Sequence, residues 1–215
     1  KNINKLALGH TKDDQAETVL MRLLRGTGMQ GLQAIRPKRV LDGKTFVRPL
    51  LCVDKEEIER FLKDKKQDFR VDATNQQTDF FRNRIRHELL PLLKKEYNPN
   101  IVTVWANFSD TVADDYKILE ALGESALAGL MVEHNEEAIT LRLEEFQNEP
   151  PALQRLILRR AVHLLKGDLN QIDFVHWAEV EDMLSSRPDG SIVHWPASVW
   201  IQKRAPHLIV GRTKA

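Results

Sequence analysis

A short apolar run leads directly into an amphipathic helical pattern, and this pair most constrains how the chain can fold. The run INKLALGH ends at Gly9 and is typical of a buried strand. Residues 13–25 then repeat apolar side chains at spacings of three and four, as in a helix with one buried face. A strand KTFVRPL and a second helix DKEEIERFLKDKK follow, the latter with a capping box formed by Asp54 and Glu57. This alternation predicts an α/β unit.

The tetrapeptide YNPN at 97–100 indicates a boundary, and the pattern changes after it. We expect a long helix over 101–130 and a strand in AITLRLEEF (138–146). A further helix is expected in PPALQRLILRRAVHLLKGD (150–168), with proline at its entry and Gly167 at its exit, and another over 173–186. Strand-like patches surround Trp195, Trp200 and residues 208–210. The sequence therefore predicts two domains, an α/β domain over 1–98 and a mainly helical domain over 99–215.

Composition excludes several classes of protein. The chain has 32 Lys plus Arg against 31 Asp plus Glu, so its formal net charge of +1 does not indicate a nucleic-acid binder. Its single cysteine, Cys52, excludes an internal disulfide framework and favours a cytoplasmic protein. Apolar runs are too short to span a membrane. Neither a glycine-rich phosphate motif of the Walker A or GxGxxG type nor a His/Cys metal-ligand spacing is present.

Acidic residues cluster where the first strand gives way to the helix, and they have two interpretations. Thr11 and Asp14 fit a capping box, and Asp13 and Asp14 complement the helix dipole. Capping does not explain Glu17, which lies one turn further on the same face as Asp14. Because His10 lies at the strand-to-helix edge where α/β proteins bind ligands, a carboxylate pair there is also suited to an ammonium group or a metal. Both interpretations stay open at this point.

Arginines alternate in the segment FFRNRIRHELLP. Arg82, Arg84 and Arg86 each offer a planar fork suited to phosphate, from RNA or from a nucleotide. The alternative is a solvated helix start, which is weakened because cations are unfavourable there. A second basic set, Arg155, Arg159 and Arg160, is better explained as a solvated helix face.

Four segments together carry a resemblance to a known family. In order they are KLALGHTKDDQAETVLMRLLRGTGMQGLQAI, VRPLL, VDATNQQTDFFRNRIRHELLPLL and PALQRLILRRAV. The chain resembles the tRNA(Ile)-lysidine synthetases, which are N-type ATP-pyrophosphatases. The resemblance implies part of a Rossmann-like parallel sheet, of the adenine nucleotide alpha-hydrolase type, followed by a mainly helical domain.

The resemblance also implies an activity. Members of this family activate the wobble cytidine of tRNA(Ile), which has a CAU anticodon, as an adenylated base formed from ATP. Free lysine then displaces AMP to give lysidine. The implied cofactors are ATP and Mg²⁺, and the implied partners are tRNA(Ile) and free lysine, without a membrane; a homodimer is compatible with the sequence.

Site residues are carried over from the resemblance by position. It places Asp14 and Glu17 as the catalytic pair in the pocket for lysine and cytidine. The remaining residues are His10 and Asp13 on the same edge, Arg25 facing nucleotide phosphate, and Arg82, Asn83, Arg84 and Arg86 near the base and the adenylate.

Three departures from the family qualify this expectation. The Ser-Gly-Gly-x-Asp-Ser phosphate loop is absent and is expected upstream of Lys1, so we expect a fragment that is inactive alone. Thr11 stands where a second histidine is common, and a C-terminal tRNA-binding extension is not evident. Two alternatives are a related tRNA thiolase, which the single Cys52 disfavours, and an RNA-binding module that has lost its nucleotide site.

Overall fold

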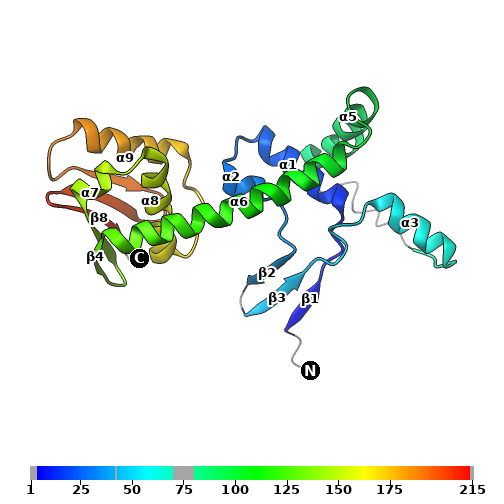
Figure 1. Cartoon of the computed structure of the whole chain (residues 1–215), viewed down its shortest axis with the longest axis horizontal. Coiled ribbons are helices and arrows are strands. Elements are labelled where there is room, and N and C mark those ends of the chain that lie inside the picture. The colour runs from blue at the N-terminus through cyan, green and yellow to red at the C-terminus, as the bar shows by residue number, and fades with distance from the viewer. Residues whose placement is uncertain (1–3, 42, 70–79, 214–215) are drawn as a thin grey trace. The chain divides into compact units, whose positions relative to one another are not determined.

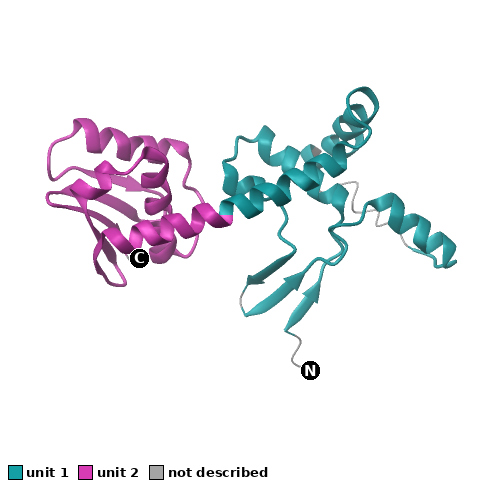
Figure 2. Cartoon of the chain, in the orientation of Figure 1, with its two compact units in different colours: residues 1–116 teal, residues 117–215 magenta. Residues whose placement is uncertain are grey.

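The computed structural model describes residues 4–41, 43–69 and 80–213 (Figure 1). The chain divides into two compact units, residues 1–116 and 117–215 (Figure 2). Each has a hydrophobic core of its own. The division between the two compact units falls within the long helix α6 (Ile101–Leu130). The domain boundary between residues 98 and 99 stays a prediction.

Unit 1 contains a three-stranded sheet whose strands are β1 (Lys5–Ala7), β2 (Lys38–Leu41) and β3 (Lys44–Val47). Their order is β1-β3-β2, with β1 parallel to β3 and β2 antiparallel to it. Since parallel neighbours need a crossover connection, helix α1 follows β1 before the chain returns to the sheet. Strands β1 and β3 form where they were predicted, but β1 is exposed along its length and not buried as expected. Strand β2 was not predicted from the sequence.

Helix α1 (Lys12–Leu24) begins at the predicted cap. The Thr11 hydroxyl accepts from the backbone N–H of Asp14, whose carboxylate accepts in turn from the Thr11 backbone N–H. Of the apolar face predicted from the spacing, Ala16, Val19 and Leu20 are buried, whereas Leu23 near the end of the helix is exposed. The cap therefore fixes where the helix starts, and the periodic apolar side chains fix which face turns to the core.

The remaining helices of unit 1 complete its core. They are α2 (Met29–Leu32), α3 (Lys55–Asp64), α4 (Phe80–Arg84), a π-helical turn η2 (Ile85–Leu89) and α5 (Leu90–Glu96). The predicted capping box of Asp54 and Glu57 is confirmed at the start of α3. Helix α1 packs against α4 and η2, where Leu20 and Ile85 share one core. The arginine-bearing segment is thereby held against the acidic helix.

A buried polar chain fastens α1 to α6. The Gln15 side-chain amide donates to the Ser109 hydroxyl at 2.7 Å, and that hydroxyl donates to the Gln33 carbonyl at 3.0 Å. The side-chain amide oxygen of Gln15, Oε1, accepts from the backbone N–H of Ile35 at 2.8 Å. Buried polar groups are costly unless paired, so these contacts fix the position of α1 relative to α6 and to the loop after α2.

Unit 2 combines helices with a five-stranded antiparallel sheet in the order β4-β5-β8-β7-β6. The strands are β4 (Met131–His134), β5 (Ala138–Arg142), β6 (Ile192–Trp195), β7 (Val199–Arg204) and β8 (His207–Arg212). The helices, besides the end of α6, are α7 (Leu143–Asn148), α8 (Pro151–Lys166) and α9 (Phe174–Ser186). The expected fold class, an α/β unit followed by a mainly helical one, is confirmed, and the strand-like patches of the second domain join into this sheet.

One strand prediction in unit 2 was too long. AITLRLEEF was expected to be extended throughout, but only Ala138–Arg142 is a strand and α7 begins at Leu143. Leu143 and Phe146 are both buried and lie three residues apart, which is the spacing of one helical face and not of a strand.

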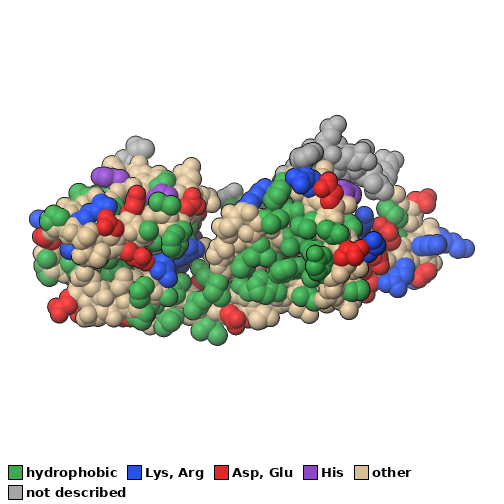
Figure 3. Space-filling view, turned by 90° about the horizontal axis from the view of Figure 1, so that it is seen from above, with side chains coloured by type: hydrophobic (Ala, Val, Ile, Leu, Met, Phe, Trp, Pro, Cys, Tyr) green, Lys and Arg blue, Asp and Glu red, His purple; other side chains and the backbone are tan. Residues whose placement is uncertain are grey.

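Charges of both signs lie interspersed on the face seen in Figure 3, which agrees with the near balance of acidic and basic residues. Arg155 pairs with Glu181 and Arg160 with Glu124, and the two arginine side chains are 36% and 34% exposed. Arg159 lies over the Trp177 ring, so this basic set is half-buried and paired, and is not the fully solvated helix face that was expected. Over the described part of the chain, no helix is both long and apolar enough to cross a membrane.

Replacing Ser109 with alanine tests the buried polar chain. The Gln15 amide then loses its acceptor while it stays buried, so we expect the free energy of unfolding of unit 1 to fall by about 1–3 kcal/mol. Urea-dependent hydrogen exchange of the α1 amides measures this for unit 1 alone. Thr111→Ala on the same helix removes an exposed hydroxyl that bonds to the Asn107 carbonyl, and is expected to change stability by less than about 0.5 kcal/mol. Equal effects of the two substitutions would contradict the prediction.

Candidate functional site

The candidate site lies where β1 ends and α1 begins, at the carboxyl end of a strand that has a parallel neighbour. This edge is the usual ligand-binding edge of an α/β sheet. The turn between the two elements carries His10 and Thr11, and the first two turns of α1 carry Asp13, Asp14 and Glu17. The sheet thus brings the predicted acidic residues to the position where the sequence analysis expected them to act.

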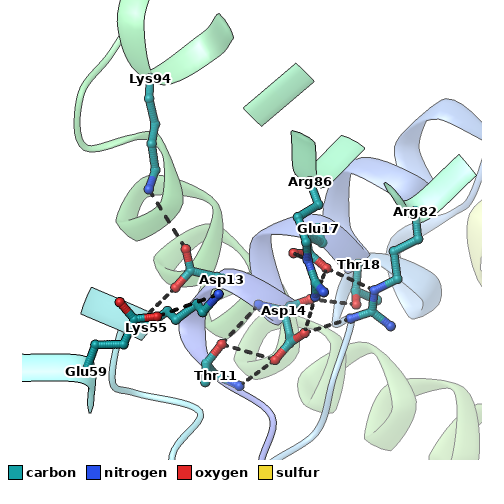
Figure 4. Close-up of polar contacts among 10 residues, drawn as sticks. All are labelled: Thr11, Asp13, Asp14, Glu17, Thr18, Lys55, Glu59, Arg82, Arg86 and Lys94. Atoms are coloured by element: carbon teal, nitrogen blue, oxygen red, sulfur yellow. Dashed lines mark hydrogen bonds and ion pairs between the residues drawn. The ribbon is translucent and has the colours of Figure 1, made fainter. Parts of the chain in front are cut away.

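Two arginines from α4 and η2 bind both carboxylates of the pair Asp14 and Glu17 (Figure 4). Arg82 donates through Nε to Glu17 Oε2 at 2.9 Å and through Nη2 to Asp14 Oδ1 at 3.0 Å. Arg86 donates through Nε to Glu17 Oε1 at 2.6 Å and through Nη2 to Asp14 Oδ1 at 3.0 Å. We call these four side chains the charge network.

Helical spacing explains why the four side chains meet. Asp14 and Glu17 are three residues apart on α1, and Arg82 and Arg86 are four apart on the facing segment, so each pair lies on one helical face. The Arg82 and Arg86 forks each span both acids, a geometry that guanidinium groups favour with carboxylates. The acidic pair and the arginine cluster, two separate features of the sequence, therefore form one site.

Burial makes this network more than a surface ion pair. The Glu17 side chain is only 2% exposed, whereas those of Arg82 and Arg86 are about one third exposed, at 31% and 34%. An ionised carboxylate at such a position needs charged or hydrogen-bonding partners. The hydrogen bond to Glu17 raises the pKa of Arg86, and the two positive and two negative charges cancel.

The two interpretations of the acidic cluster hold for different residues. Asp14 fits both the capping and the site interpretation: Oδ2 completes the cap with Thr11, while Oδ1 accepts from both arginines. Glu17 takes no part in the cap, and its two oxygens are bound only by Arg82 and Arg86 in the described structure. Glu17, which capping did not explain, is thus the acid whose two carboxylate oxygens are both bound by network arginines.

Asp13 points away from the network, as Figure 4 shows. Its Oδ2 accepts from the backbone N–H of Lys55 at 2.9 Å, at the start of α3, and its Oδ1 lies 3.9 Å from Lys94 Nζ on α5. Asp13 therefore ties the beginning of α1 to the beginning of α3, and adds negative charge where α3 has unpaired N–H groups.

The remaining predicted residues lie outside the network. Arg84 is exposed and pairs with Glu88, four residues on. The Arg25 guanidinium lies over the Phe81 ring, 5.2 Å from its centroid. Asn83 lies half-buried on α4. Residues 71–79, the first part of the third resembling segment, fall outside the described residues.

His10 has a partner that the sequence analysis did not predict. Arg48, which directly follows β3, donates through Nε to His10 Nδ1 at 3.2 Å. Burial is the main reason that the pKa of His10 lies below its ordinary value of 6.5. The pairing follows from the sheet, because the parallel strands β1 and β3 end side by side.

A groove of about 660 Å³ opens beside the network. Its lining includes Asp14, Glu17 and Arg86 of the network, together with apolar side chains of α3 and α5 such as Ile58 and Leu90. The groove also has charged residues, which include Asp13, Lys55, Glu59 and Lys94. Its volume suits a small organic molecule with both an apolar and a charged part.

Comparison with known proteins places this site in a family context. A PP-loop domain model matches residues 1–93, and a TilS substrate binding domain model matches residues 141–204. The tRNA(Ile)-lysidine synthase of Geobacter sulfurreducens is 37% identical over 98% of this chain and 44% of its own length. That of Solibacter usitatus is 40% identical over 88% of this chain and 42% of its own length.

The chain is a relative of the tRNA(Ile)-lysidine synthases. The resemblance predicted from the sequence is thereby confirmed. The match of residues 1–93 to a PP-loop domain supports ATP as the nucleotide of this kind of domain. The Bifunctional protein TilS/HprT of Listeria monocytogenes is also similar, at 37% identity over 91% of this chain and 30% of its own length. The chain spans less than half the length of these relatives, and the roles of the individual site residues stay predictions.

A double-mutant cycle tests whether the network acts as one unit. Glu17→Gln removes a buried charge and Arg86→Met removes one of its partners, so each alone leaves unpaired groups behind. We expect the double variant to be less destabilised than the sum of the two, with a coupling free energy of about 1–3 kcal/mol. Hydrogen exchange of the α1 amides supplies the four values.

Arg84→Met is the matched control for this cycle, since Arg84 lies between the two network arginines in sequence but is exposed and pairs with the exposed Glu88. Its effect on stability is expected to stay below about 0.5 kcal/mol. Additive effects of Glu17→Gln and Arg86→Met would show that the contacts do not act together.

Proposed function

We propose that this chain forms part of a tRNA(Ile)-lysidine synthase, which ligates lysine to the wobble cytidine of tRNA(Ile) at the expense of ATP. The reaction proceeds through an adenylated cytidine, from which the lysine amine displaces AMP. The observation that carries the proposal is the charge network of Asp14, Glu17, Arg82 and Arg86 at the ligand edge of the sheet. The names of the relatives support the choice of substrates.

The network contains the two kinds of group that this reaction needs. A carboxylate pair suits the ammonium group of lysine, and arginine forks suit the phosphate of an adenylate. In the resting protein these groups neutralise each other. We propose that Arg82 and Arg86 turn towards phosphate when the nucleotide is bound, and that Asp14 and Glu17 then accept the ammonium group in their place.

The groove beside the network is the proposed lysine pocket. Once Arg82 and Arg86 have turned away, the carboxylates of Asp14 and Glu17 suit an ammonium group, and the apolar lining residues such as Ile58 suit the aliphatic stem of lysine. Lys55 and Lys94 on the same groove suit a carboxylate. A zwitterion with a long apolar stem therefore matches the distribution of charge in the groove better than a purely apolar ligand does.

Nucleotide contacts are proposed for the arginine-rich segment. Besides Arg82 and Arg86, we assign Asn83, Arg84 and Arg25 to contacts with the base and the phosphate. The described residues contain no group of three or more His, Cys, Asp or Glu side chains able to hold a metal ion. We therefore propose that Mg²⁺ is held mainly by the nucleotide's own phosphates and by water, as is common for this ion.

The wider assignments rest on the same proposal. Residues 1–98 would handle the nucleotide, the lysine and the cytidine, and residues 99–215 would contact the tRNA. The proposed setting is the cytoplasm, and a homodimer stays a prediction. A thiolase on the same scaffold is disfavoured because the chain has one cysteine, the exposed Cys52. A non-catalytic RNA-binding module does not account for a neutralised carboxylate pair at the ligand edge.

A chimera tests the function directly. Residues 1–215 replace the matching part of the Geobacter sulfurreducens synthase, and incorporation of labelled lysine into tRNA(Ile) is measured. The unsubstituted chimera is expected to be active, and Glu17→Gln to lose on the order of 10²-fold in rate, the size of effect seen when one preorganised electrostatic group is removed.

Lys63→Gln in the same chimera is the control, because it removes an exposed charge at the end of α3. Its rate is expected to stay within about twofold of the unsubstituted chimera. Near-normal lysine incorporation by Glu17→Gln would refute the pocket assignment, and sulfur transfer in place of lysine incorporation would support the thiolase.

A further inference from the structure

Arg48 links two parts of the site through one side chain. Its Nη1 donates to the Arg36 carbonyl at 2.6 Å, in the loop between α2 and β2. Its Nε donates to His10 Nδ1 at 3.2 Å, and its backbone N–H donates to the Pro37 carbonyl at 2.9 Å. The guanidinium is therefore fixed in orientation by contacts on both sides, and His10 meets a rigid donor.

The chemistry of the two groups decides where the imidazole proton lies. A guanidinium group has only donors and stays protonated in proteins. The ring nitrogen that faces Arg48 must therefore be an acceptor without a proton of its own. In the neutral ring the proton then lies on Nε2, and a second proton on Nδ1 would place two N–H groups against each other.

Burial and the nearby charges together lower the pKa of His10; burial is the largest cause, and among the charges the opposing effect of Asp14 is the largest. Arg48, which follows β3, and Arg82 of α4 both lower the pKa of His10, and burial lowers it most. Asp14 of α1 opposes them. Since the lowering causes prevail, the ring is neutral above its ordinary pKa of 6.5 and becomes protonated only at lower pH than a free histidine.

We propose that Arg48 is a positioning residue that holds His10 as the Nε2-protonated tautomer. His10 then presents a hydrogen-bond donor, and not a base, to a substrate bound at the ligand edge of the sheet. The tautomer follows from the contacts alone, whereas this last step rests on the proposed function. Arg48 itself need not touch any substrate for this role.

The tautomer is measured on the 215-residue chain with ¹⁵N-labelled histidine. Long-range ¹H–¹⁵N correlation spectra distinguish protonated from unprotonated ring nitrogens, and His10→Gln identifies the His10 signals by their loss. At pH 8 the unsubstituted chain is expected to show His10 almost wholly as the Nε2–H form. A predominant Nδ1–H form, or a mixture of the two, would overturn the proposal without any variant of Arg48.

Variants of Arg48 then test the cause. Arg48→Met keeps the length of the side chain but removes every donor, so we expect a mixture of tautomers and a His10 titration midpoint that moves upward. Arg48→Lys keeps donors and a positive charge, and is expected to restore the Nε2–H form. If Arg48→Met leaves the tautomer unchanged, Arg48 does not set it.

A matched control separates this role from loosening of the neighbouring loop. Arg22 also fixes a loop, since its Nη1 donates to the Gly31 carbonyl, but no contact with His10 is recorded for it in the described structure. Arg22→Met is expected to leave the His10 tautomer and midpoint unchanged, and a shift equal to that of Arg48→Met would overturn the proposal. The spectra need no ATP, lysine or tRNA, so an inactive chimera would refute the proposed function and leave this measurement intact.

Discussion

The position of Glu17 is the constraint on which unit 1 depends. Its side chain is almost fully buried on the helix that also supplies Ala16 and Leu20 to the core. A buried carboxylate requires compensating donors, and Arg82 and Arg86 are those donors. The segment that carries them must therefore lie against α1, which is where the core shared by Leu20 and Ile85 also places it. Electrostatics and packing specify the same arrangement.

Local patterns predicted most elements of the fold, because caps and periodicity act over a few residues. Both capping boxes and the helices over 101–130 and 151–166 are confirmed. Strand β2 was missed, since KRVL is short, exposed and rich in charge, and it depends on its pairing with β3. The end of β5 was misplaced because Leu143 continues the alternation of Ile139 and Leu141. The burial of both Leu143 and Phe146, three residues apart, shows that this part of the segment has a helical face.

The site was predictable only in part, for a related reason. Spacing put Asp14 and Glu17 on one face, but it does not indicate that their partners lie 65 or more residues away, at Arg82 and Arg86. Asp13 and Asp14 are neighbours in sequence, yet one helical step of about 100° sends them to different partners. Arg48 directly follows β3 in the segment VRPLL, but its role was missed because its contact with His10 depends on β1 and β3 being adjacent.

Neutrality of the network bears on how such a site selects its ligands. Two unpaired arginines would attract any phosphate, and two unpaired carboxylates any cation. The arginines and the carboxylates bind each other. A phosphate that binds the arginines alone must therefore displace the carboxylates and leave them unpaired, and a cation that binds the carboxylates alone must leave the arginines unpaired. A phosphate and an ammonium group that arrive together replace both partners at once. In the proposed reaction, the resting ion pairs therefore favour the pair of substrates over either substrate alone, and the burial of Glu17 strengthens this preference because an unpaired charge there is most costly.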